Sequence, residues 1–81
     1  MNSQLRFESS DIYLSAYLVS QGAKLEGVER DKDNRMVFLI GREDNLDSLL
    51  RDYWSNEPVT VIPSQLFAGL KFLKSLLYSS R

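Results

Sequence analysis

Leucine side chains recur along one face of a helix that the sequence predicts over residues 63–81. Pro63 and Ser64 are typical of a helix start. The apolar positions are Leu66, Leu70, Leu73 and Leu77, with Phe67 and Tyr78 on one side of this stripe and Phe72 and Leu76 on the other. At 100° per residue the apolar residues span an arc of roughly 240° around the helix axis. The apolar arc of a helix at a protein surface typically spans about 100° or more. We therefore expect the helix to pack on its own sheet and on a second surface, supplied by another helix or by a partner molecule.

Two shorter helices are predicted earlier in the chain, over residues 12–21 and 46–54. Ser9, Ser10 and Asp11 are typical of a helix start, because a serine hydroxyl can cap the free N–H groups and an acid suits the positive end of the helix dipole. Gly22 suits the left-handed conformation that ends a helix. The second segment has apolar residues at every position of the i, i+3, i+4, i+7, i+8 template. The first segment therefore predicts a short, mostly apolar helix, and the second predicts an amphipathic helix with one buried face.

Three strands are predicted, over residues 24–30, 35–40 and 58–62. The first interrupts its alternation of apolar and polar residues, and a bulge at Gly27 would restore its apolar residues to one face. A polar turn follows, in which Asn34 suits a positive φ. The second strand is an unbroken apolar run, which indicates a central position buried on both faces, whereas the charged first strand suits an edge.

These elements predict an α+β fold with the order α-β-β-α-β-α. We expect a single domain over residues 1–81, with residues 1–8 as a flexible N-terminal arm. A right-handed crossover through the second helix would place the third strand parallel to the second. The expected result is a three-stranded mixed sheet packed with helices.

Composition narrows the chemistry that this chain can perform. The 81 residues include no cysteine and no histidine, so disulfides, thiolate metal sites and the commonest general base are excluded. The carboxylates lie on predicted polar faces and turns, and no nucleophile–base pair can be assembled. We therefore expect no enzymatic activity, no cofactor and no metal.

The longest apolar run is too short to span a bilayer and the N-terminus lacks an apolar signal region, so we expect a cytoplasmic protein.

Four apolar or aromatic residues are candidates for contact with a protein partner or with a second copy in a homodimer. Tyr53 and Trp54 end the second helix, and aromatic residues of this kind are common anchors of interfaces. Phe72 and Leu76 lie outside the leucine stripe of the last helix and require cover. The alternative, which the sequence leaves open, is that the first helix covers these residues within the same chain.

Nucleic-acid binding is the alternative function, through Arg42, Arg51, Lys71 and Lys74. The formal net charge is −1, and residues 64–81 hold three cations and no acid, so residues 1–63 carry −4. Cations near the end of a helix also complement its dipole, so part of this asymmetry is ordinary helix design. Phe38 is the only aromatic residue in the predicted strands, and we assign it to the core rather than to a base-stacking surface.

Three features together resemble a small uncharacterised domain family of bacteria and phages. They are the pattern F-x-S-S-D-x-Y-L-x-A-Y-L over residues 7–18, Gly22 followed by L-E-G-V-E-R over residues 25–30, and Val59, Val61, Pro63 and Phe67 with the leucine–lysine steps at 70–71 and 73–74. The resemblance covers nearly the whole chain and brings no catalytic residues with it. It implies an accessory or regulatory role with a protein or nucleic-acid partner.

Overall fold

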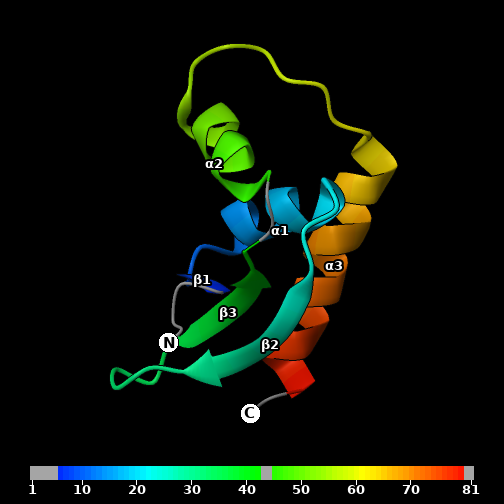
Figure 1. The fold of residues 1–81 in the computed structure, drawn as a ribbon. Coiled ribbons are helices and arrows are strands. Elements are labelled where there is room, and N and C mark those ends of the chain that lie inside the picture. Colours follow the sequence, from blue (N-terminus) through cyan, green and yellow to red (C-terminus); the bar gives the residue numbers. More distant parts are fainter. Residues whose placement is uncertain (1–5, 43–44, 80–81) are drawn as a thin grey trace.

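The computed structural model describes residues 6–42 and 45–79, which form three helices and one three-stranded sheet (Figure 1). The strands are β1 (Arg6–Ser9), β2 (Leu25–Arg30) and β3 (Met36–Gly41), and the helices are α1 (Ile12–Ser20), α2 (Leu46–Trp54) and α3 (Pro63–Ser79). The predicted α+β class, with helices packed on one three-stranded sheet, is confirmed. The order of elements is β-α-β-β-α-α. It differs from the prediction in two places, because a strand precedes α1 and no strand lies between α2 and α3.

The central strand of the sheet is β3, as its continuous apolar run predicts. The strand order is β1-β3-β2, and β3 is antiparallel to both neighbours. The register of β2 against β3 shifts between Leu25 and Gly27, which confirms the predicted bulge. Asn34 adopts a φ of 65° in the turn between these strands, also as predicted.

The first correction concerns the N-terminal segment, for which we expected a flexible arm. Residues 6–8 of that arm belong to β1, and residues 1–5 lie outside the described part of the chain. In β1 the exposed Arg6 and Glu8 alternate with the half-buried Phe7 and Ser9, which is the period-two pattern of an edge strand. Four residues are too few for this pattern to be recognised locally. The strand forms because the second edge of β3 is available to pair with it, and the sheet is therefore wholly antiparallel rather than mixed.

The second correction concerns residues 58–62, which do not form a strand. This segment belongs to a connection that arches from the end of α2 to the start of α3, on the side of the helices away from the sheet (Figure 1). Val59 and Ile62 are exposed there, while Val61 is half-buried. The Gln21 side chain donates a hydrogen bond to the carbonyl of Thr60 at 3.2 Å. A β-prone sequence forms no strand here because both edges of β3 are already paired.

Helix α1 is the buried helix of the fold. The helix start predicted at residues 9–11 is confirmed, but the capping group is the Asp11 carboxylate and not a serine hydroxyl. This carboxylate accepts hydrogen bonds from the backbone N–H groups of Tyr13 and Leu14 at 2.9 and 3.2 Å. Residues 14–18 are all buried, and Gly22, with a φ of 104°, follows the helix in the left-handed conformation. This helix therefore gives α2 and α3 a fixed surface on which to pack.

Helix α3 packs chiefly against α1. Gly69 lies where the two helices meet, and a Cβ atom at that position would be in van der Waals contact with the carbonyl oxygen of Ala16, at 3.4 Å. Leu73 is fully buried in the same core cluster as Phe38 and Ile40 of β3. The second surface expected for α3 is thus another helix of the same chain, and the direct packing on the sheet is smaller than expected.

Candidate partner-binding surface

The four residues predicted to bind a partner are distributed over two helices. Tyr53 and Trp54 end α2, and Phe72 and Leu76 lie in the middle and second half of α3. Trp54 is 67% exposed and Phe72 is 50% exposed, whereas Tyr53 and Leu76 are half-buried against the core. Whether any of the four contacts a partner stays a prediction.

Three aromatic rings connect α1 to the end of α2. The ring centroids of Tyr17 and Tyr53 are 5.6 Å apart, and Trp54 stands edge-on to Tyr53 at 5.1 Å. Burial raises the pKa of both phenols, with a further contribution from the negative charge of Asp52 at Tyr17 and of Asp11 at Tyr53. Tyr53 therefore contributes an internal contact that holds α2 on α1, whereas most of the Trp54 side chain is exposed to solvent.

A cleft of about 300 Å³ lies where the three helices meet. Its lining is apolar or aromatic: Tyr13 and Tyr17 from α1, Tyr53 from α2, and Leu66, Phe67 and Leu70 from α3. We call it the three-helix cleft. Tyr13 and Phe67 are 62% and 64% exposed at its rim. A surface of this kind is preformed, because each wall is a helix anchored in the core.

A second cleft, of about 400 Å³, is shallow and open to solvent, and it runs along the outer side of α3. Its residues are Phe67, Leu70, Lys71, Lys74, Ser75 and Tyr78, which we call the α3 stripe. Their spacing is that of one helical face. Phe67 and Leu70 also line the three-helix cleft, so the two clefts form one continuous surface, the aromatic face. Tyr78, at its far end, is 70% exposed.

The sequence placed Phe67 and Tyr78 on one flank of the leucine stripe but did not select them as a site. The two flanks of the stripe can be told apart only once the position of α1 is known. Gly69 faces Ala16 of α1, whereas Phe67 lies at the exposed rim of the cleft between α1 and α3. Gly69 itself is the signal that could have identified the buried side, because glycine inside a helix often marks close approach of another backbone.

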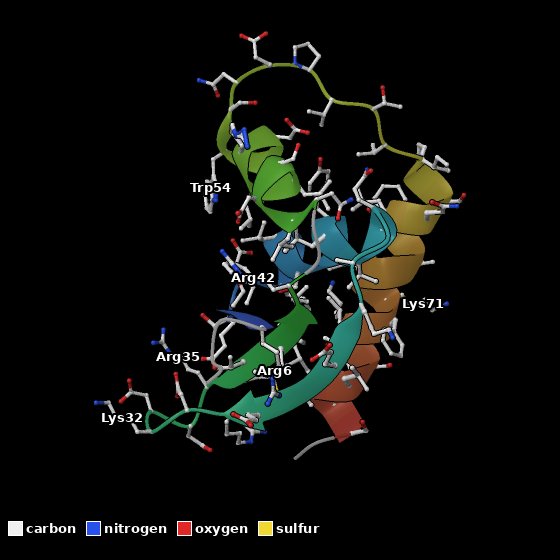
Figure 2. All side chains as sticks on the ribbon, viewed as in Figure 1. Arg6, Lys32, Arg35, Arg42, Trp54 and Lys71 are labelled. Carbon is white, nitrogen blue, oxygen red and sulfur yellow. The ribbon has the colours of Figure 1, made fainter. Side chains whose placement is uncertain are left out.

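The four cations of the nucleic-acid alternative are divided between two parts of the molecule. Arg42 donates a hydrogen bond to the carboxylate of Asp47 at 3.0 Å, so its charge is matched within the chain. Arg51 is exposed on α2. Lys71 and Lys74 lie together on the α3 stripe, and Figure 2 shows Lys71 on the far side of the molecule from Trp54.

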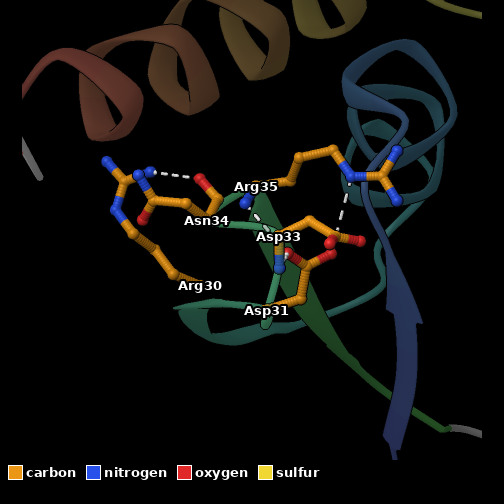
Figure 3. Close-up of polar contacts among 5 residues, drawn as sticks. All are labelled: Arg30, Asp31, Asp33, Asn34 and Arg35. Carbon is orange, nitrogen blue, oxygen red and sulfur yellow. Dashed lines mark hydrogen bonds and ion pairs between the residues drawn. The ribbon is translucent and has the colours of Figure 1, made fainter.

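The polar turn between β2 and β3 uses its carboxylate internally (Figure 3). One oxygen of Asp31 accepts hydrogen bonds from the backbone N–H groups of Asp33 and Arg35, both at 2.9 Å. Its other oxygen lies 3.6 Å from Nε of Arg35. These hydrogen bonds, first of all that from the Arg35 backbone, lower the pKa of Asp31. The turn is thus a structural unit whose carboxylate is already engaged.

Other kinds of functional site are scarce within residues 6–42 and 45–79. No three acidic, histidine or cysteine side chains of this part gather closely enough to hold a metal ion. None of its helices has the length and hydropathy to cross a membrane. The aromatic face is the feature of the described chain that most clearly suggests binding.

Comparisons with curated proteins and with solved structures find no match to this chain. A family model described as Domain of unknown function (DUF5659) matches residues 5–79, nearly the whole chain. The match agrees with the resemblance to an uncharacterised domain family. The chain therefore belongs to the DUF5659 family.

Proposed function

We propose that this chain is a non-enzymatic interaction module that binds a protein partner through the aromatic face. The observation that carries the proposal is the exposure of Tyr13, Phe67 and Tyr78 around two adjoining clefts. Exposed aromatic side chains that adjoin one another around such clefts are typical of surfaces that bind proteins. Aromatic side chains in preformed pockets are also the residues that supply most binding energy at protein interfaces.

The aromatic face is held in place by buried residues next to it. Leu73 and Gly69 fix α3 in the core and against α1, and Tyr17 fixes the opposite wall of the three-helix cleft. A partner would therefore meet a surface that needs little rearrangement, which reduces the entropic cost of binding.

Nucleic-acid binding remains the alternative function. The two lysines of the α3 stripe stand beside aromatic rings that could stack on bases. Two cations are few for a phosphate backbone, and Arg42 is already paired with Asp47. We therefore favour a protein partner.

The proposal also includes an accessory or regulatory role in the cytoplasm of a bacterium or in a phage. This part of the proposal is supported by the sequence pattern of residues 7–18 and 25–30 and its resemblance to bacterial and phage domains.

Affinity capture from an extract of the native host tests the proposal. Three baits are compared after nuclease treatment: the wild-type chain, Phe67→Glu on the aromatic face, and Phe72→Glu, which places the same charge on the flank of α3 that the sequence predicted to bind. We expect specific proteins to be retained by the wild type and by Phe72→Glu and lost from Phe67→Glu. Equal retention by all three baits, or retention that nuclease abolishes, would contradict the proposal. Light scattering of the purified chain distinguishes a second copy from another protein as the partner.

A further inference from the structure

Resting on the proposed function, we propose that the partner contributes an amphipathic helix with aspartate or glutamate beside its apolar face. The inference concerns the chemistry of the partner, which the aromatic face itself restricts through its shape and its charge.

The shape of the aromatic face suits a helix. Phe67, Lys71, Lys74 and Tyr78 follow one another at four, three and four residues along α3. At 1.5 Å per residue this line is about 16 Å long, or three helical turns. A partner helix laid beside it would place anchors at i, i+3 or i+4, and i+7 opposite these residues, which is the usual way an amphipathic helix occupies an apolar groove.

The charge of the aromatic face favours acids in the partner. Lys71 and Lys74 both line the cleft and are exposed, and no ion pair engages either within the part of the chain that the structure describes. Helix α3 contains no acidic residue from Pro63 to Ser79. A partner carboxylate near these lysines would gain a charge partner without breaking an existing one, whereas a basic partner would be repelled.

A second copy of this chain fits the aromatic face less well. The segment of the chain that is both acidic and apolar is α2, but Leu46 and Leu49 are buried in its own core. Its exposed apolar residue, Trp54, lies on the opposite side of the molecule from Lys71 (Figure 2). A contact between these two surfaces would join copies head to tail and would not close into a dimer.

Selection from a random peptide library tests the inference without an identified partner. The probe is a phage-displayed library of peptides of about 16 residues, long enough for four helical turns. The baits are the full chain, Phe67→Glu, the double variant Lys71→Glu/Lys74→Glu, and the control Lys24→Glu/Lys32→Glu, which reverses two exposed lysines elsewhere. Circular dichroism establishes that all four baits are folded.

We expect the wild type and the control to select the same peptides, with apolar residues at helical spacing and with aspartate or glutamate beside them. Synthetic copies should bind the Lys71→Glu/Lys74→Glu variant about tenfold or more weakly, and high salt should reduce this difference. That variant should itself select peptides rich in lysine or arginine.

Two other results separate failure of this inference from failure of the proposed function. Peptides that require Phe67 but are neutral or basic, and that bind the lysine variant equally well, would overturn the inference and leave the interaction module standing. An absence of any peptide that requires Phe67 would overturn both. Retention of single-stranded DNA or RNA by the wild type, lost in the lysine variant, with no acidic peptide selected, would favour the nucleic-acid alternative instead.

Discussion

Ser15 is the buried polar residue of α1, and its hydroxyl has no hydrogen-bond partner among the described residues. A buried hydroxyl without a partner loses its hydrogen bonds to water and gains nothing in return. The residue thus lowers the stability of a helix whose other buried positions are apolar or aromatic.

Replacement of Ser15 by alanine should therefore stabilise the protein. We expect Ser15→Ala to raise the free energy of unfolding by about 1 kcal/mol, because the unpaired hydroxyl is removed and alanine favours the helix. Urea denaturation measures the change. Ser20→Ala is the control, since the Ser20 hydroxyl donates a hydrogen bond to the carbonyl of Tyr17 at 2.7 Å. A lower midpoint for Ser15→Ala would show that the hydroxyl has a partner or role that the structure lacks.

Asp31 should make the stability of the chain depend on pH in the acid range. Its pKa is lowered in the folded state, so its contribution is fully present above the unfolded value of about 3.9 and is lost as the pH falls through the folded value. We expect Asp31→Asn to be less stable than the wild type at about pH 7 and the difference to shrink below about pH 4. Chemical denaturation across this range measures it, with Asp33→Asn as the neighbouring control. A difference that is constant with pH would contradict the role given to the carboxylate.

The packing of α3 on α1 depends on Gly69, where there is room for little more than a methyl group. A Cβ atom at Gly69 would already lie 3.4 Å from the backbone of Ala16, so a larger side chain must separate the helices. We expect Gly69→Val to lower the free energy of unfolding by about 1–3 kcal/mol more than Ala68→Val, an exposed position with the same new side chain. Thermal or urea unfolding compares the two variants. Equal losses would mean that the helices do not approach as closely as the structure shows.

Amide hydrogen exchange should distinguish β1 from the segment first expected to be a strand. We expect slow exchange in β3 and at the paired amides of β1, and fast exchange over residues 57–60, which are exposed and belong to no strand. Exchange followed by NMR resolves these residues individually. If the amides of residues 59–62 exchanged as slowly as those of β3, this segment would form a strand as the sequence predicted. That result would contradict the connection described between α2 and α3.

The elements that the sequence predicted correctly are those with a strong local signal. The apolar run of β3, the helix start at residues 9–11 and the positive φ of Asn34 are all set by residues within a few positions of one another. The arrangement of β1 and of residues 58–62 depends instead on which segment occupies the free edge of β3. That competition is between segments distant in the sequence, so neither local propensity nor alternation could decide it.

The aromatic face could be predicted only in part for a similar reason. Both flanks of α3 are apolar in the sequence, and the identity of the covered flank depends on the direction from which α1 approaches. The three-helix cleft additionally combines residues from three helices, and no periodicity within one helix predicts such a combination. What the sequence did predict is that α3 has more apolar surface than one neighbour can cover.

At the scale of the whole molecule, the buried core and the aromatic face have separate roles. The largest fully buried side chains come from all three helices and from β3, so the core is complete without Tyr13, Phe67 or Tyr78. The charges are also divided, since residues 1–63 carry the excess of acids and the aromatic face carries two lysines. These properties together make the aromatic face the surface on which a protein partner is expected.

The affinity of the captured partner for two variants of α3 tests this central claim most directly. Isothermal titration calorimetry would compare the wild type, Phe67→Glu on the aromatic face, and Phe72→Glu on the other flank. We expect Phe67→Glu to raise the Kd by about thirtyfold or more, as for an interface anchor, and Phe72→Glu to leave it nearly unchanged. A loss of affinity in Phe72→Glu with none in Phe67→Glu would place the partner on the opposite flank and contradict the account.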